Sequence, residues 1–240
     1  MKGGKQMNRL QRIRAYEKEY HDDCYENRIL FESGSWLEKP VRTVLDLFEQ
    51  LERPNGLRLL DLGCGVGRNS IPLASRLSGT GGKVVCVDLL ESAIRHLEKY
   101  GREHGVEEEL ELHRCDIAAF RIEPDRYDYI FSVSSLEHLD SMDSFVKVLG
   151  AMAAGTRTGG IHCLIVNAGV KEVCLATGEE LDPKFELMLD TEELGSLLAE
   201  KYRGWELLRH AVKPYELEIQ RDGEPVSLRS DVVTWAARKK

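Results

Sequence analysis

The sequence predicts an α/β fold in which a mostly parallel sheet carries helices on both faces. Two observations lead to this prediction. Between residues 57 and 166, short apolar segments rich in β-branched residues alternate with amphipathic helical segments, and a glycine-rich turn directly follows the first apolar segment. Alternation at this spacing is typical of βαβ units, whose right-handed crossovers leave few topologies open.

The strands predicted in this part of the chain are short, apolar and bounded by turn residues. They are 57–62, 83–88, 110–114, 127–133 and 160–166. The segments around them have apolar residues at helical spacing, and Pro72 falls in a first helical turn, where proline is tolerated. The predicted helices are 8–31, 41–51, 68–77, 91–104 and 142–155.

The last third of the chain departs from this alternation. Asp190 and Glu193 have the spacing of a capping box, so a helix is predicted to start there and to run to about Tyr202. Two further strands are expected to form an antiparallel hairpin, at 204–212 and 231–240 around a turn at Asp222-Gly223.

Length and charge limit the possible partners. The 240 residues show no dividing linker, so 41–240 are expected to form a single domain, with 1–40 as an N-terminal helical lid or extension. The net charge of −8 disfavours nucleic acid and anionic lipid as partners. Without a visible secretory signal or membrane-spanning run, and with six scattered cysteines, a cytoplasmic location is expected.

The glycine-rich turn has a spacing that distinguishes between ligands. Gly63, Gly65 and Gly67 alternate directly after Asp61, at the start of a predicted helix whose free N–H groups suit an acidic ligand group. A dinucleotide fingerprint would place its third glycine one residue later, where this chain has Arg68. No Gly-Lys-Ser/Thr follows, which excludes a Walker A loop.

Asp88 ends the second predicted strand. In a parallel sheet the carboxyl ends of neighbouring strands lie side by side, so Asp88 is expected beside the glycine loop, in the crevice where ligands bind. A carboxylate there can accept hydrogen bonds from two ribose hydroxyls. The alternative is an acid that only caps the following helix.

These residues resemble the class I S-adenosylmethionine (SAM)-dependent methyltransferases. The resemblance rests on LLDLGCGVG, VVCVD, CDI (115–117) and YDYIFSVSSLEHL (127–139), in that order, and covers about residues 38 to 170. It implies a Rossmann-like sheet of seven strands in the order 3-2-1-4-5-7-6, with the last strand antiparallel. It also implies SAM as cofactor, S-adenosylhomocysteine (SAH) as product and a small-molecule substrate as acceptor.

A narrower resemblance extends into the last third. GRNSIPLA, TGGIHCLIV, RGWELL and TWAARK are similar to segments of the small tellurite-resistance-type methyltransferases. Members of that group typically carry a His-Arg pair in the hairpin, implicated in acting on the oxyanion. Glu218 and Ile219 stand near the corresponding positions here, a departure that argues against tellurite or selenite as substrate.

The resemblance implies a set of cofactor-binding residues. Asp61 would lie near the methionine end or hold the loop structurally, and Asn69 would bond either to the cofactor or to loop backbone. Asp116 and Ile117 would contact the adenine, and the backbone carbonyls of Ser132 and Val133 would face the cofactor's amino group. Gly67 would approach the cofactor or only allow a helix to pack. The full predicted set is Asp61, Gly63, Cys64, Gly65, Gly67, Asn69, Asp88, Leu89, Asp116, Ile117, Ser132 and Val133.

The acceptor side is less defined. His138 and Glu137 are the first candidates for a general base, should the acceptor need one, although His138 could instead cap the turn after its strand. Tyr25 and Trp36 belong either to a lid over the cofactor or to ordinary packing. Strand-end geometry predicts an acceptor pocket between residues 16–40, 134–139 and 167–190. No metal is expected.

Several functions remain open at this point. The first is methyl transfer from SAM to a small molecule such as a thiol or an oxyanion, by a monomer or homodimer. The second is a SAM- or SAH-binding sensor or partner subunit without catalysis, because an intact cofactor motif fits both. An NAD-dependent oxidoreductase is the third, and Arg68 at the third-glycine position disfavours it.

Overall fold

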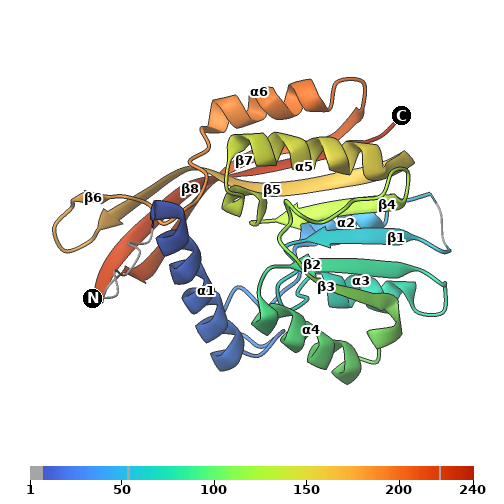
Figure 1. Ribbon diagram of the computed structural model, residues 1–240, viewed down its shortest axis with the longest axis horizontal. Coiled ribbons are helices and arrows are strands. Elements are labelled where there is room, and N and C mark those ends of the chain that lie inside the picture. The colour runs from blue at the N-terminus through green and yellow to red at the C-terminus, as the bar shows by residue number, and fades with distance from the viewer. Residues whose placement is uncertain (1–7, 53–54, 222) are drawn as a thin grey trace, which may run out of the picture.

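A central sheet organises the computed structural model, which describes residues 8–52, 55–221 and 223–240 (Figure 1). Its strand order is β3-β2-β1-β4-β5-β8-β7. These strands are β1 (Arg58–Leu62), β2 (Lys83–Asp88), β3 (Leu110–Arg114), β4 (Tyr127–Val133), β5 (Thr156–Cys174), β7 (Glu206–Arg221) and β8 (Glu224–Arg238). Strands β1 to β5 of this path pair in parallel, and β8 is antiparallel to both its neighbours.

The predicted order 3-2-1-4-5-7-6 is confirmed for this path. The sheet differs from the prediction by one additional strand, β6 (Glu180–Leu181), which pairs with β5 beside the main path. This pairing is antiparallel and places the segment before the last helix against the outer end of β5. The signal for β6 is absent from the sequence because two polar-flanked residues have no periodicity.

Helices cover both faces of the sheet, as predicted. They are α1 (Arg9–Asn27), α2 (Arg42–Phe48), α3 (Ser70–Leu77), α4 (Glu91–Glu103), α5 (Met142–Gly155) and α6 (Thr191–Lys201), with short 3-10 turns η1 (Glu107–Glu109) and η2 (Leu136–His138). Along β1, Leu59 packs in the cluster that includes α2, α3 and α4, whereas Leu60 packs in the cluster that includes α5 and α6. The alternation of side chains along a strand thus builds two cores from one sheet.

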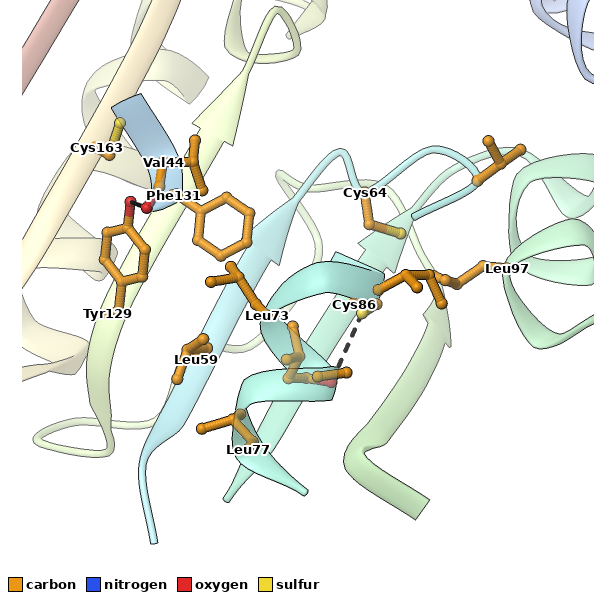
Figure 2. Packing of buried hydrophobic residues seen from close by; sticks show 14 of the residues in the cluster. Val44, Leu59, Cys64, Leu73, Leu77, Cys86, Leu97, Tyr129, Phe131 and Cys163 are labelled. Carbon is orange, nitrogen blue, oxygen red and sulfur yellow. Dashed lines mark hydrogen bonds between the residues drawn. The ribbon is translucent and has the colours of Figure 1, made fainter. Parts of the chain in front are cut away.

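The core on the α3 face is shown in Figure 2, where Leu59, Leu73 and Leu77 gather between β1 and α3. The Tyr129 hydroxyl donates to the Val44 carbonyl oxygen at 3.0 Å, which fixes α2 against β4. Because β2 and β4 are buried on both faces, they are almost continuously apolar, as parallel central strands are.

The C-terminal strands are much longer than the sequence predicts. Strand β5 continues past residue 166 to Cys174, and the hairpin strands fill the gap between the predicted 204–212 and 231–240. The added part of β7 is largely exposed and holds its place by pairing with β8, so no alternating apolar pattern is needed. Pro214 is compatible with β7 because β7 is the edge strand. Of the predicted turn, Asp222 lies outside the described residues.

Helix α6 begins where the sequence predicts. The Asp190 carboxylate accepts hydrogen bonds from the backbone N–H groups of Glu192 and Glu193, at 2.9 and 3.0 Å. Helix α1 ends earlier than predicted, at Asn27. Within the described residues, none of the helices is both long enough and apolar enough to cross a membrane.

The far end of the hairpin is tied to β5 and α1. The Arg221 guanidinium donates two hydrogen bonds to Glu172, at 2.9 and 2.8 Å, and both side chains are buried. The guanidinium carbon lies 4.6 Å from the centre of the Tyr16 ring, and the Tyr16 hydroxyl donates to the Gln220 carbonyl oxygen at 3.0 Å. At its other end α1 reaches α4 (Figure 1), through the pairs Asp22–Ser92 and Glu26–Arg95.

The Arg221→Ala substitution leaves the Glu172 carboxylate buried without its partner. We expect a loss of about 3–5 kcal/mol in the free energy of unfolding, measured by urea denaturation. The matched control is Arg229→Ala, which breaks the exposed pair with Glu216 and should change stability by less than about 1 kcal/mol. Equal effects of the two substitutions would contradict the role given to the buried pair.

Candidate functional site

One cavity of about 440 Å³ lies at the carboxyl ends of the parallel strands. Its walls come from α1, the segment before α2, the glycine loop after β1, the ends of β2 and β4, the loop after β3, η2, the segment before α6, and the hairpin. This volume is within the range of small-molecule sites, which commonly lie in the crevice at the strand ends of such sheets. It includes all three segments predicted for the acceptor pocket, and the hairpin in addition.

Two glycines of the loop have no room for a side chain. A Cβ on Gly63 would lie 2.0 Å from the Ser135 hydroxyl oxygen, and one on Gly65 would lie 3.1 Å from the Tyr25 hydroxyl oxygen. Both residues have positive φ and line the cavity. The loop is therefore pressed between the end of β4 on one side and α1 on the other.

Gly67 serves helix packing. A Cβ there would lie 2.3 Å from a methyl carbon of Leu97 on α4 and 3.0 Å from Ile71 on α3. Gly67 does not line the cavity, unlike Cys64, whose buried thiol has a pKa raised by burial. Of the two roles considered for Gly67, this position favours helix packing over approach to the cofactor.

Asp88 joins the loop to the end of β2. Its two carboxylate oxygens accept hydrogen bonds from the backbone N–H groups of Gly65 and Leu90, each at 2.9 Å. Burial raises the pKa of Asp88, and the carboxylate lines the cavity. Leu89 also lines the cavity and is half exposed. Asp88 thus holds the loop and remains available to a ligand.

Asp61 and Ser132 lie behind the cavity wall. Asp61 is buried and accepts a hydrogen bond from the Ser70 hydroxyl at 2.5 Å. Burial, with the neighbouring Asp88 carboxylate, raises the pKa of Asp61 to about 7. The Ser132 hydroxyl donates to the Leu62 carbonyl oxygen at 2.8 Å, which ties β4 to β1. Neither residue lines the cavity, so any action on a ligand would pass through the loop or a bridging water.

Asp116, Ile117 and Val133 do line the cavity. The Asp116 carboxylate accepts from the Ala118 backbone N–H at 2.9 Å and from the Arg14 guanidinium at 3.3 Å. Arg14 belongs to α1, so α1 contacts the segment that is predicted to hold the adenine. Sequence reasoning did not select Arg14.

The segment before α2 packs against the start of α3. Arg68 donates to the Trp36 carbonyl oxygen at 2.7 Å, and its guanidinium carbon lies 5.2 Å from the centre of the Trp36 ring. Tyr25 and His21 of α1 lie 6.2 and 6.1 Å from the same ring, centre to centre. The Asn69 side chain accepts from the Val41 backbone N–H at 2.9 Å, and Asn69 lines the cavity. Tyr25 and Trp36 thus pack together at the cavity wall, an arrangement that fits both roles considered for them, a lid and ordinary packing.

His138 and Glu137 have different surroundings although they are neighbours in η2. The His138 ring lines the cavity, and its Nδ1 lies 2.8 Å from a Glu186 carboxylate oxygen. Glu137 is fully buried, does not line the cavity, and accepts from the backbone and side-chain N–H groups of Asn167, at 3.0 and 2.6 Å. The geometry favours His138 over Glu137 as a group that can reach a ligand.

The sequence did not single out several of the lining residues. They are Arg14, Glu17, Lys18, Tyr20, Asn167, Phe185, Glu186, Tyr215, Leu217 and Val232. The lining residues of α1 place charged and aromatic side chains on one helical face. Their spacing along the sequence is the signal that could have identified them. Among the described residues, no group of three or more His, Cys, Asp or Glu side chains is arranged to hold a metal ion.

Comparisons with known proteins show what this chain is similar to. A family model described as a methyltransferase domain matches residues 59–160. Methyltransferase GfsG of Streptomyces halstedii is 27% identical over 145 residues, which are 59% of this chain and 50% of that protein. Ubiquinone biosynthesis O-methyltransferase of Methylocella silvestris is 34% identical over 110 residues, 44% of this chain and 38% of that protein. The chain thus covers half or less of the length of these relatives.

Solved structures show the same fold. TehB from Haemophilus influenzae superposes with a TM-score of 0.63 at 23% identity, covering 92% of this chain and 67% of that one. The [4+2]-cyclase SpnF has a TM-score of 0.61 at 14% identity, covering 97% of both chains. A geranyl diphosphate methyltransferase in complex with SAM has a TM-score of 0.55 at 15% identity, covering 82% of this chain and 84% of that one. Residues 59–160 thus match a methyltransferase domain, and the chain shares its fold with these solved structures.

Proposed function

We propose that this chain binds SAM in the cavity and catalyses transfer of its methyl group to a small-molecule acceptor, leaving SAH. The observation that carries the proposal is the hydrogen bond from the Gly65 N–H to the Asp88 carboxylate, which lies at the end of β2 against the glycine loop, where a ribose could be bound. The glycine loop also leaves room for SAM, because Gly63 and Gly65 line the cavity and have no side chains to fill it.

In this proposal, different residues of the site bind different parts of SAM. Asp88 accepts hydrogen bonds from the ribose hydroxyls, and Asp116 with the Ile117 N–H takes the adenine edge. Gly63, Cys64 and Gly65 present backbone to the methionine part, and the Val133 carbonyl faces its amino group. Tyr25 and Trp36 cover the bound cofactor and exclude water, which keeps the reacting groups aligned.

Bound SAM supplies a methyl group that its sulfonium has already activated. The protein therefore needs no nucleophile of its own, and its main contribution is alignment of the acceptor with the methyl carbon. Holding two reactants in line can lower a barrier by about 7–11 kcal/mol. The cavity walls around the glycine loop supply this alignment.

A second candidate function is SAM or SAH binding without methyl transfer. It stays a candidate because the contacts of the glycine loop and Asp88 concern binding alone, and SpnF, which shares this fold, is named a [4+2]-cyclase and not a methyltransferase. Two measurements separate the candidates. Thermal shift with SAH and with NAD identifies the ligand, and time-dependent SAH release with a panel of acceptors shows turnover. Stabilisation by NAD alone would overturn the proposal, and SAH binding without release in any mixture would favour the second candidate.

The Gly63→Ala substitution tests the close approach of the loop. The new methyl would meet Ser135 at a φ of +84°, so the loop must shift, and SAH affinity should fall at least about tenfold. Gly79→Ala is the control, since Gly79 has a φ of +75° in a turn with open space around it. Calorimetry should find SAH affinity unchanged there. Equal affinities of the two variants would argue against the loop as the binding site.

The Asp88→Ala substitution removes the charge-assisted hydrogen bonds to the ribose. Affinity for SAH, measured by calorimetry, should drop by about 10- to 100-fold. Glu91→Ala, at a nearby exposed acid outside the cavity, should leave it unchanged. A folded Asp88→Ala protein that binds SAH as tightly as the wild type would sink the ribose assignment.

Asp61 gives cofactor binding a predicted pH dependence. The free protein keeps Asp61 protonated below its raised pKa of about 7. A bound ammonium group nearby favours the carboxylate and so lowers that pKa, which means that binding releases a proton. Affinity for SAH should therefore rise with pH up to about 7 and level off above it. Asp61→Asn should flatten the rise in calorimetric titrations, and an unchanged pH profile in this variant would refute the coupling.

A further inference from the structure

We propose, resting on the function above, that Arg14 of α1 is a further cofactor-binding residue, whose guanidinium bridges Asp116 and the adenine of the bound cofactor. Through this bridge α1 docks more firmly on the cavity when the cofactor is present. Two observations carry the proposal. One is the Arg14–Asp116 contact at the cavity wall, and the other is a buried N–H group of Arg14 that has no partner among the described residues.

The Arg14–Asp116 pair lies at the end of the cavity where the adenine is expected. Arg14 Nη2 lies 3.3 Å from Asp116 Oδ2, and both residues line the cavity together with Ile117. The two side chains are 33% and 29% exposed, so the pair is neither fully buried nor free in solvent. The contact joins α1 to the loop after β3, and a base held by Asp116 and Ile117 therefore lies beside Arg14.

Asp116 can hold Arg14 and an adenine amino group at the same time. Its Oδ1 atom accepts from the Ala118 backbone N–H at 2.9 Å, and its Oδ2 atom accepts from Arg14. Each oxygen of a carboxylate has two lone pairs, so each oxygen can accept one hydrogen bond more. The amino group can therefore be added without loss of the ion pair, which makes Arg14 a partner of the cofactor rather than its competitor.

The Nε atom of Arg14 supplies the second observation. It is buried, and none of the described residues accepts its hydrogen. A buried donor without an acceptor is costly, and native structures satisfy nearly all such groups, so this N–H group indicates a ligand. An adenine ring has nitrogen atoms that accept hydrogen bonds and a flat face on which a guanidinium can stack. Because Arg14 lines the cavity, a bound base is the partner that the cavity can supply.

The other contacts of α1 are weak enough for this one to be important. Of the 19 residues of the helix, Ile13 and Tyr25 are the buried ones, and Tyr16 ties the helix to the hairpin. Near the end of α1, the side chains of the Glu26–Arg95 ion pair are 54% and 62% exposed, and exposed pairs of this kind contribute little. A charge-assisted hydrogen bond from Arg14 to the cofactor therefore adds appreciably to the docking of α1.

The docking of α1 also affects the acceptor side of the cavity. Glu17, Tyr20 and His21 of α1 line the same cavity as His138 of η2. A contact that strengthens the docking of α1 therefore stabilises this wall as well. Coupling between two binding sites is reciprocal, so an acceptor bound against α1 should tighten the binding of the cofactor. Arg14 thus links the adenine end of the cavity to the acceptor side.

Calorimetry with the intact chain tests the proposal with three probes: SAH, adenosine, and S-ribosylhomocysteine, which is SAH without its adenine. In Arg14→Ala, the affinities for SAH and for adenosine should each fall about tenfold or more, and the affinity for S-ribosylhomocysteine should stay unchanged. Arg12→Ala is the matched control, because Arg12 is an exposed arginine on the same helix and outside the cavity. It should change none of the three affinities.

Arg14→Lys separates the charge of the group from its shape. Lysine keeps a positive charge for Asp116, but it has no planar guanidinium and no N–H group at the position of Nε. It should therefore recover at most part of the affinity for SAH that Arg14→Ala loses.

Hydrogen exchange along α1 reports its docking directly. SAH should slow the exchange of the α1 amides in the wild type and in Arg12→Ala, and this slowing should be lost in Arg14→Ala. A wild type whose α1 exchanges equally fast with and without SAH would contradict the docking role.

Three further outcomes would overturn the proposal. The first is an affinity for SAH or for adenosine that is unchanged in Arg14→Ala. The second is an equal loss of affinity for SAH and for S-ribosylhomocysteine, because Arg14 would then only hold α1 in place. The third is full recovery of SAH binding in Arg14→Lys, which would leave no role for the Nε–H group. Failure of the proposed function is different, because the wild type then does not bind SAH.

Discussion

The Asp88 carboxylate, with a backbone N–H on each oxygen, is the contact on which the rest of the site depends. Parallel pairing in register brings Leu62 beside Val87, so the loop after β1 leaves the sheet where β2 ends. Asp88 then fixes Gly65 of that loop and Leu90 at the start of α4. Several neighbouring contacts are made at or beside this loop: Ser135 against Gly63, Tyr25 against Gly65, and Arg68 against Trp36.

The two sides of the cavity are built from different parts of the chain. The parallel half of the sheet supplies the side of the cavity with the glycine loop and Asp88, where the hydrogen bonds of Asp88 are to backbone N–H groups. The other side is made by α1, the segment before α6 and the hairpin, and includes contacts between side chains such as His138–Glu186 and Arg14–Asp116. Buried pairs such as Arg221–Glu172 hold these parts together, so differences in acceptor among proteins of this fold can arise without disturbing the loop.

The sequence predicted the parallel strands and the glycine loop far better than it predicted α1, the segment before α6 and the hairpin, for physical reasons. Strands β1, β2 and β4 are largely apolar, β3 alternates apolar and polar residues, and Asp88 could be placed because parallel strand ends coincide. The outer part of β7 lacks a pattern because an exposed edge strand is stabilised by pairing with β8 alone. Glu186 and Arg14 reach the cavity by contacts between residues far apart in the chain, on which local spacing carries no information. The bond of Arg68 to the Trp36 carbonyl oxygen likewise joins distant parts of the chain and has no signal in local spacing.

The most direct measurement is a crystal structure of the chain with SAH bound. The account predicts both ribose hydroxyls within hydrogen-bond distance of Asp88 and the sulfur beside Gly63. Ribose bound away from Asp88, or SAH bound outside the cavity, would contradict it.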